Sequence, residues 1–335
     1  MRAKETAVYF KKESVRILNM ETAFLTDVPM SEYTTYKIGG PAKYFAEALN
    51  KADIANILDA YNKRIPGDKK TFILGGGANV LFPDEPYNGL VLKISISGIE
   101  LLPDNILRIG AGAKLADVVQ FAAEHNLSGI EWAAGIPGSF GGAIRGNAGA
   151  FGGEIKDSVL SVTSVDRKDI SNPIIRKNSG DLFGYRTSAF KLSAKEEIII
   201  EAEIKLVPGR TGEIREKMDK NIKTRKERQP VEWPSAGSIF KNIDVSKITE
   251  TQKKEWASLI KLDPIPVLPV AFLLSEAGLK GETEGGIQIS EKHPNFFINI
   301  GEGKSRDVKK LITLAKKKVK EKFEIKLEEE IQIVE

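Results

Sequence analysis

Residues 71–81, TFILGGGANVL, join a short apolar run directly to three consecutive glycines. The run 71–74 predicts a buried strand, and glycines 75–77 place no Cβ atom beside the backbone that follows it. Backbone N–H groups in such a turn can wrap an anion such as a pyrophosphate. The dinucleotide fingerprint G-x-G-x-x-G is not met, because Val80 occupies the third glycine position. A structural turn and a phosphate loop therefore both remain open for these residues.

A second glycine-rich tract, residues 135–153 (GIPGSFGGAIRGNAGAFGG), has eight glycines in nineteen positions. Because ordered glycine loses much backbone entropy, we predict that the tract forms no regular element and cradles a flat, polar ligand. A flexible linker is the alternative, but a linker would lack large apolar side chains. Such side chains are interleaved here: Trp132, Ile136, Phe140, Ile144 and Phe151.

Composition limits the chemistry of this 335-residue chain, which has no cysteine and two histidines, His125 and His293. Disulfides, thiolate nucleophiles and iron–sulfur ligation are excluded, and we expect no metal site. We expect His125 to close a helix, whereas His293 lies in a polar loop where a ligand contact and a structural role are equally open.

The charge pattern predicts a mixed, solvated surface. Fifty cations against 46 anions give a net charge of +4, which favours small anionic ligands over nucleic acid. The sequence has no apolar run of membrane-spanning length, and residues 1–20 lack the apolar core of a signal peptide. We therefore expect a soluble, cytoplasmic protein with no membrane segment.

Periodicity divides the chain into two parts with a boundary after Arg228, since Pro230 disfavours helix at the preceding residue. The predicted helices cover residues 51–61, 114–125, 213–228, 270–277 and 309–322. The predicted strands cover residues 71–74, 90–94, 106–109, 198–206, 287–290, 296–300 and 323–334. We expect Ser305 to be the N-cap of the lysine-rich helix over 309–322 rather than part of a P-loop.

Three polar sites lie outside the glycine tracts. Arg186, among small and aromatic residues, could grip a carboxylate through two parallel hydrogen bonds, and Ser238 offers a hydroxyl beside a glycine. In the last predicted strand, alternation turns Glu328 and Glu330 to one face and Glu329 to the other. Taken singly, a surface ion pair, a turn hydroxyl and a solvated acidic face explain them as well.

Taken together, seven collinear motifs resemble the UDP-N-acetylenolpyruvoylglucosamine reductase (MurB) family over residues 20–335. They are YKIGGP (36–41), GGGANVL (75–81), GIPGS (135–139), NAGA (147–150), FGYR (183–186), AGS (236–238) and LEEEI (327–331). The resemblance implies an α+β protein with a PCMH-type (vanillyl-alcohol-oxidase-like) FAD-binding fold and a smaller α+β substrate domain of the MurB C-terminal type. The implied FAD-binding region is 1–228, in two subdomains of about 1–70 and 71–228, followed by a substrate domain at 229–322. Residues 323–335 would form a terminal strand that returns to the FAD domain.

The resemblance also implies the reaction. NADPH would reduce a non-covalently held FAD, which reduces UDP-N-acetylglucosamine enolpyruvate to UDP-N-acetylmuramate for peptidoglycan precursors in the cytoplasm. We expect a monomer. The short spacing between Arg186 and Ser238, 52 positions, is similar to the type II form that lacks an extra tyrosine loop.

Site residues carry over by motif. Arg186 matches the arginine beside the enolpyruvyl carboxylate, Ser238 the proton donor and Glu330 the acid that works with Arg186. The implied FAD contacts are Gly75, Gly76, Gly77, Ala78, Asn79, Val80, Gly138, Ser139, Gly141, Gly142, Asn147, Gly149 and Arg225. The implied substrate contacts are Tyr185, Arg228, Asn242 and His293.

Two positions depart from the family pattern. Arg145 stands where many members carry an apolar or aromatic residue, and Glu329 replaces a proline between the two terminal acids. These departures bear on the flavin contacts near Arg145 and on the choice of Glu330 over Glu328.

Two other functions remain open. A PCMH-type oxidase of a small alcohol or sugar is disfavoured, because such enzymes often attach FAD through His or Cys and neither occurs in the glycine tracts. A nucleotide-sugar-binding protein without catalysis is the other, and the presence of Arg186, Ser238 and Glu330 argues against it.

Overall fold

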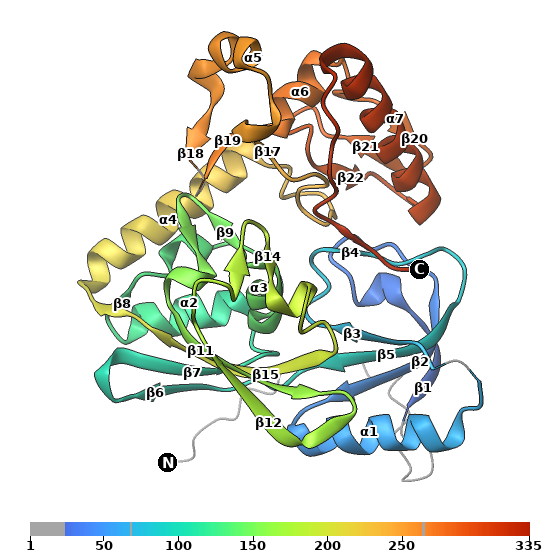
Figure 1. Cartoon of the computed structure of the whole chain (residues 1–335), viewed down its shortest axis with the longest axis vertical. Coiled ribbons are helices and arrows are strands. Elements are labelled where there is room, and N and C mark those ends of the chain that lie inside the picture. The colour runs from blue at the N-terminus through green and yellow to red at the C-terminus, as the bar shows by residue number, and fades with distance from the viewer. Residues whose placement is uncertain (1–23, 68, 263–264) are drawn as a thin grey trace, which may run out of the picture.

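The computed structural model describes residues 24–67, 69–262 and 265–335, so the part of the predicted first domain at 1–23 lies outside the described residues. An N-terminal region, residues 24–228, carries a smaller C-terminal region, residues 229–323, above it (Figure 1). The last residues, 324–335, are called the C-terminal segment below.

The N-terminal region begins with a four-stranded sheet in the order β1-β2-β5-β3. Its strands are β1 (Leu25–Pro29), β2 (Pro41–Ala48), β5 (Tyr87–Ile94) and β3 (Thr71–Leu74). Strands β2, β5 and β3 are parallel, and β1 is antiparallel to β2. Helix α1 (Lys51–Arg64) lies along this sheet and buries Ile54, Ile57 and Leu58 (Figure 1). The predicted helix at 51–61 and strands at 71–74 and 90–94 are confirmed.

A second, antiparallel sheet in the order β12-β11-β15-β7-β6 forms the rest of this region. Its strands are β6 (Ile99–Leu102), β7 (Ile106–Gly110), β11 (Val159–Asp166), β12 (Asp169–Lys177) and β15 (Glu197–Lys205). Helices α2 (Leu115–Glu124) and α4 (Thr211–Arg228) lie beside it, where the sequence predicts them. In β15 the buried Ala202 and Ile204 alternate with Glu201 and Glu203, as predicted for a half-buried strand. Short pairs complete the region: β8 (Leu127–Ser128) with β16 (Val207–Pro208), β9 (Gly149–Ala150) with β10 (Gly153–Glu154), and β13 (Phe183–Gly184) with β14 (Thr187–Ser188).

The prediction that the glycine tract 135–153 forms no regular element is wrong, because it contains helix α3 (Phe140–Gly146). The Ser139 side chain caps this helix by accepting a hydrogen bond from the Gly142 N–H at 3.4 Å. Phe140, Ala143 and Ile144 are buried in the main core, and this packing offsets the entropy that the glycines lose. The helix ends at Asn147, whose φ of 45° is left-handed.

Within its described residues, the C-terminal region holds two three-stranded sheets and three α-helices. The strands are β17 (Ile243–Asp244), β18 (Lys261–Leu262), β19 (Pro266–Leu268), β20 (Thr283–Glu284), β21 (Ile287–Ile289) and β22 (Phe297–Asn299). The helices are α5 (Glu250–Glu255), α6 (Val270–Glu276) and α7 (Ser305–Phe323). Helix α7 buries an apolar stripe that includes Val308, Ala315 and Val319, as its periodicity predicts.

Ser305 is not the N-cap of α7, which corrects the prediction. It is the first helical residue and is buried, while Lys304 occupies the capping position. Asp84, in the loop between β4 (Val80–Leu81) and β5, instead accepts hydrogen bonds from the backbone N–H groups of Ser305 and Arg306, at 2.7 and 3.0 Å. A carboxylate from the N-terminal region thus satisfies the positive end of a helix in the C-terminal region.

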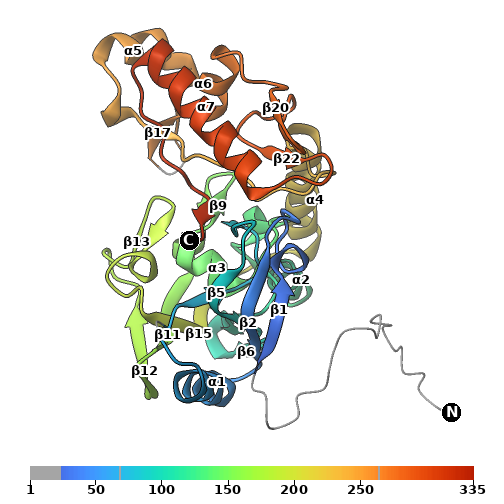
Figure 2. The same ribbon diagram turned by 90° about the vertical axis from the view of Figure 1, so that its right-hand side faces the viewer.

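The predicted strand over 323–334 is mostly wrong. Phe323 belongs to α7, Glu324 ends that helix with a φ of 60°, and only β23 (Gln332–Ile333) is a strand. Strand β23 pairs in parallel with β4, so the chain returns to the N-terminal region (Figures 1 and 2). After the left-handed Glu324, residues 328–331 make isolated backbone contacts with residues 239–241 in place of a regular strand ladder.

The two regions share a buried core. Tyr36, Ile38 and Leu81 of the N-terminal region pack with the apolar residues of α6 and α7. In the described part of the chain, no helix combines the length and apolar character needed to cross a membrane.

Candidate active site

The two glycine tracts meet at the N-terminus of α3. The Gly76 N–H donates to Ser139 Oγ at 3.0 Å, and the same hydroxyl accepts from Gly142. A Cβ atom at Gly76 would lie 2.5 Å from the Ser139 backbone nitrogen, and one at Gly77 would lie 2.0 Å from the Tyr33 carbonyl oxygen. These glycines are therefore required by the close approach of backbone to backbone.

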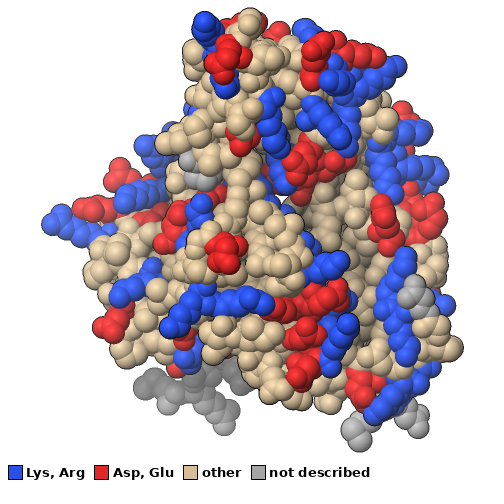
Figure 3. Space-filling view, viewed as in Figure 1, with Lys and Arg blue, Asp and Glu red and all other residues tan. Residues whose placement is uncertain are grey.

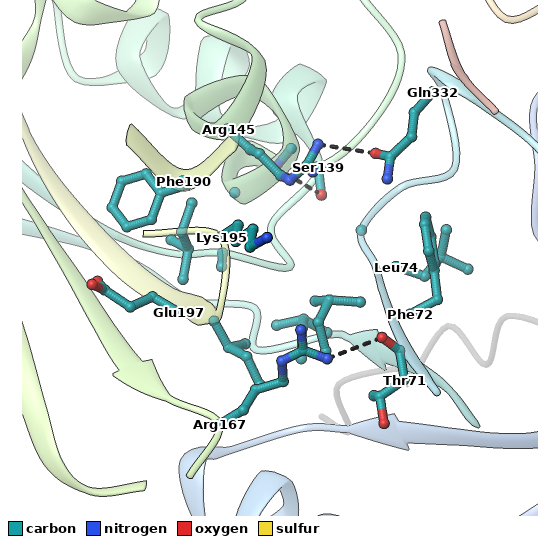
Figure 4. Close-up of a pocket in the computed structure, with 18 residues that line it drawn as sticks. Thr71, Phe72, Leu74, Ser139, Arg145, Arg167, Phe190, Lys195, Glu197 and Gln332 are labelled. Carbon is teal, nitrogen blue, oxygen red and sulfur yellow. Dashed lines mark hydrogen bonds between the residues drawn. The ribbon is translucent and has the colours of Figure 1, made fainter. Parts of the chain in front are cut away.

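This junction forms one wall of a cavity of about 170 Å³. The predicted cofactor residues Gly75, Ser139, Gly141 and Gly142 line it. Its charged side chains are Arg145, Arg167, Lys195 and Glu197 (Figure 4). A glycine-backed cavity with three cations and one acid suits a nucleotide that carries phosphate groups.

Arg145, the first departure from the family pattern, lines this cavity. Its guanidinium donates to Gln332 Oε1 at 2.9 Å, and burial lowers its pKa (Figure 4). Across the cavity, Arg167 donates to the Thr71 carbonyl oxygen at 3.0 Å. Neither arginine was predicted as a cofactor contact.

Other predicted cofactor residues hold the surrounding loops. Gly138 has a φ of 113°, and a Cβ atom there would lie 3.2 Å from the Ala78 Cβ. The Asn79 side chain donates to the Glu330 carbonyl at 3.1 Å, and Val80 pairs with Gln332 in β23. The cradle is thereby fastened to the C-terminal segment.

Asn147 and Gly149 hold a different loop. Asn147 is fully buried and donates from its side chain to the Gly184 carbonyl at 2.9 Å. The Gly149 carbonyl accepts from Arg186 Nη2 at 2.9 Å. Both predicted cofactor residues therefore also position the turn that carries Arg186.

Arg225 lies near the end of α4 and is buried against the turn before the second glycine tract. Its Nε donates to the Ala134 carbonyl at 2.9 Å, and its guanidinium lies 4.9 Å from the centre of the Phe151 ring. Burial lowers its pKa to about 10. Arg225 therefore makes a cation–π contact with the Phe151 ring.

Arg186 lies at the centre of a partly buried polar cluster. Its Nη1 is 3.3 Å from Glu154 Oε1, and its Nε is 3.6 Å from Glu330 Oε1. Glu154 is almost fully buried and was missed by the sequence analysis, although it directly follows the glycine tract. The ring of the predicted substrate residue Tyr185 lies 5.2 Å from the Arg186 guanidinium.

The C-terminal segment brings Ser238 toward this cluster. The Glu330 N–H donates to the carbonyl of Ile239, the residue after Ser238, at 2.8 Å. Ser238 also forms an isolated bridge with Phe296. Glu328 instead hydrogen-bonds Lys241, which lowers the pKa of Glu328, and Glu329 pairs with Lys316 of α7. The structure therefore places Glu330, and not Glu328, beside Arg186.

A second cavity, of about 750 Å³, opens on the substrate side. Tyr185 and Asn242 line it, as do four lysines: Lys241, Lys247, Lys316 and Lys326. The Asn242 side chain accepts from the Val270 N–H at 3.1 Å, so its carbonyl has a structural partner. Three carboxylates also line it: Asp244, Glu328 and Glu329. Lys241 and Lys247 pair with Glu328, and Lys316 pairs with Glu329. The wall therefore has a small excess of positive charge, which is compatible with a diphosphate.

Two predicted substrate residues stand apart from this cavity. Arg228 is exposed at the end of α4, and it belongs to neither described cavity lining. His293 packs edge-on against Phe296 with ring centres 4.9 Å apart, and burial lowers its pKa. The structure does not bring either residue together with the lysines.

Comparison with known proteins defines the class of this site. The profile of an FAD binding domain matches residues 42–169, and that of the UDP-N-acetylenolpyruvoylglucosamine reductase C-terminal domain matches residues 229–334. The fold and the glycine cradle are therefore those of an FAD-dependent oxidoreductase with a PCMH-type domain.

Relatives identify the family. The chain is 38% identical over 308 residues to the UDP-N-acetylenolpyruvoylglucosamine reductase of Caldanaerobacter subterraneus subsp. tengcongensis, covering 91% of this chain and 92% of that one. It is 37% identical over 327 residues to the reductase of the same name from Agathobacter rectalis, covering 94% and 95%. The crystal structure of the reductase (MurB) from Thermus caldophilus superposes with a TM-score of 0.72 at 28% identity, covering 93% of this chain and all of that one. The chain belongs to the UDP-N-acetylenolpyruvoylglucosamine reductase family.

Proposed function

We propose that this protein reduces UDP-N-acetylglucosamine enolpyruvate to UDP-N-acetylmuramate, with NADPH as the reductant, in peptidoglycan precursor synthesis. The observation that carries the proposal is the partly buried pair of Arg186 and Glu330, together with the hydrogen bond from the Glu330 N–H to the carbonyl of Ile239, the residue after Ser238. That set provides a cation, an acid and a hydroxyl, which an enolpyruvyl reduction requires.

The glycine cradle is proposed to hold FAD without a covalent bond. Gly75 to Val80, Gly138 to Gly142, Asn147 and Gly149 would contact it, with Arg225 close by. The fit is supported by the glycine backbone of both tracts that lines the first cavity and by the cations around that cavity. When bound there, FAD would supply hydride chemistry for the reduction of the enolpyruvyl group.

Arg186 is proposed to stabilise negative charge that develops on the substrate carboxylate as an enolate forms. Glu154 and Glu330 hold its guanidinium from two sides, so its orientation is set before substrate binds. Ser238 would then deliver a proton to the adjacent carbon. This hydroxyl needs a neighbouring base or proton relay, and Glu330 is the acid proposed for it, because its N–H donates to the carbonyl of Ile239, the residue after Ser238.

The four-lysine cavity is proposed to bind the UDP diphosphate, with Tyr185 and Asn242 in its wall. Arg228 and His293 are also proposed as substrate contacts, outside the lining of this cavity. The proposed domains are 1–228 for FAD, 229–322 for substrate and 323–335 as the returning terminal segment.

We further propose that the protein acts as a cytoplasmic monomer that binds no nucleic acid. The visible face carries interspersed positive and negative side chains, as expected for a solvated surface (Figure 3). Size-exclusion chromatography with light scattering tests the monomer directly.

One experiment tests the activity. The purified protein is examined for a flavin absorbance spectrum, and NADPH oxidation is followed with and without UDP-N-acetylglucosamine enolpyruvate. We expect FAD to be released on denaturation, substrate-dependent oxidation, and a product two hydrogens heavier. A protein that stays colourless with added FAD, or NADPH oxidation that ignores the substrate, would overturn the proposal.

A further inference from the structure

The backbone at Arg186 has a φ of 52°, a left-handed conformation that costs free energy for any residue with a Cβ atom. Such a conformation persists only where surrounding contacts fix it. The Lys191 ammonium supplies one of them, because its Nζ donates to the Arg186 carbonyl oxygen at 3.0 Å. Lys191 is the last residue of a single 3-10 turn, Ala189–Lys191, that follows β14.

The rest of this turn is tied to the cradle. Ser188 Oγ donates to the Arg145 carbonyl at 2.8 Å, which joins the turn to α3. Lys191 therefore closes a short loop whose two ends are fixed, and its hydrogen bond reaches the carbonyl of the arginine itself. Without that hydrogen bond, the Arg186 backbone could leave its left-handed conformation. Its side chain is the one proposed to bind the substrate carboxylate.

Four charged groups lie close enough to Lys191 to influence its charge. They are Arg145 on α3, Arg186 in its own turn, Lys241 of the C-terminal region and Glu330 of the C-terminal segment. Burial, followed by the influence of Arg145, lowers the pKa of Lys191 to about 8. Three cations and one acid around a partly buried ammonium form a cluster that an arriving carboxylate would stabilise.

We propose that Lys191 is a positioning residue for the substrate carboxylate: it fixes the strained Arg186 turn and adds a positive charge to the cluster that receives the carboxylate. This inference rests on the proposed function. It assigns Lys191 no contact with the reacting carbon.

Substitution at Lys191 tests the inference through binding as well as turnover. Lys191→Gln keeps a donor without the charge, Lys191→Arg keeps the charge, and Lys177→Gln on exposed β12 is the matched control. Flavin absorbance changes report binding of two probes, UDP-N-acetylmuramate, which has the carboxylate, and UDP, which lacks it. We expect Lys191→Gln to weaken UDP-N-acetylmuramate binding about tenfold and to raise KM for the enolpyruvyl substrate similarly. UDP binding, FAD content and flavin reduction by NADPH should stay unchanged, and Lys191→Arg should recover most of the loss.

The pH profile provides a second readout. Above pH about 8 the unmodified protein loses the Lys191 charge, so its affinity for UDP-N-acetylmuramate should fall as pH rises through that value. The Lys191→Gln variant should lack that decline. Equal losses for both probes, or an unchanged profile and affinity in an active protein, would overturn this inference. Failure of the unmodified protein to reduce the enolpyruvyl substrate would instead overturn the proposed function.

Discussion

Arg186 is held by acceptors before any ligand arrives. Its guanidinium contacts the Gly149 carbonyl, Glu154 and Glu330, and its side chain is mostly buried. A guanidinium with fixed partners needs little reorganisation when charge develops next to it. Ser238 and Glu330 are the two groups proposed to work with it.

Ser238→Ala removes the proposed proton donor. We expect flavin reduction by NADPH to continue at its normal rate, while substrate reduction falls by about 10²- to 10⁴-fold. Stopped-flow measurement of the two half-reactions separates these rates. Ser171→Ala, an exposed change on β12, serves as the control. If turnover by Ser238→Ala equalled that of the control, another group would be the donor.

Glu330→Gln removes the carboxylate 3.6 Å from Arg186 Nε. We expect kcat to fall by about 10²-fold or more, since both the alignment of Arg186 and the proton relay depend on this acid. Glu328→Gln is the informative comparison, because Glu328 pairs with Lys241 in the second cavity. It should alter KM more than kcat. A larger kcat loss for Glu328→Gln than for Glu330→Gln would reverse the assignment.

For single residues, the sequence predicts which side chains belong to the site better than it predicts which side chains they contact. Alternation along the strand predicted for residues 323–334 assigns Glu328, Glu329 and Glu330 to its two sides. It does not predict which side chains these glutamates contact. Glu154 was missed because its role depends on the fold of the glycine tract, which packs it beside Arg186. The pairing could be found only once that tract was known to form a helix and a hairpin.

At the scale of elements, the junction of the two glycine tracts is the most constrained. Gly76→Ala would place a Cβ atom 2.5 Å from the Ser139 nitrogen and 2.6 Å from the Gly138 Cα, both backbone atoms that cannot rotate away. We expect a loss of about 2 kcal/mol in the free energy of unfolding and weaker FAD retention. Thermal unfolding with and without added FAD measures both effects.

Gly98→Ala is the matched control, because a Cβ atom there meets nothing within 4 Å. It should change the stability by less than about 0.5 kcal/mol. Full FAD content and unchanged stability in Gly76→Ala would show that the tracts can separate without cost.

Elements with strong periodicity were predictable, and those governed by tertiary contacts were not. Helix α7 followed from the spacing of Val308, Ala315 and Val319. Helix α3 was missed, because glycine content argued against a helix while the cap at Ser139 and the burial of Phe140 and Ile144 overrode it. The sequence predicts that Ser305 caps α7. Instead, Asp84, more than two hundred residues earlier in the chain, accepts a hydrogen bond from the N-terminus of this helix.

At the scale of the whole molecule, the C-terminal segment connects both regions. Gln332 accepts a hydrogen bond from Arg145 at the first cavity. Val334 is buried in a cluster of apolar residues of the N-terminal region. Ending the chain after Ile331 would remove both contacts. We expect about 2 kcal/mol less stability from the lost burial of Val334, together with reduced FAD retention.

Flavin absorbance relative to protein absorbance after gel filtration measures that retention. Glu335→Ala, which changes only the exposed final residue, is the control. A truncated protein that keeps its FAD and its stability would show that the residues after Ile331 are needed for neither.

The return of the C-terminal segment also orders events during synthesis. Domains generally fold from the N-terminus as the chain emerges. Here, however, the strand beside β4, the partner of Arg145 and the acid facing Arg186 are all translated well after β15, the last strand of the second sheet along the chain. A nascent chain can therefore assemble both sheets of the N-terminal region while its active site is still incomplete. A nascent chain that has not yet reached Glu330 would therefore hold folded sheets without the acid that lies beside Arg186.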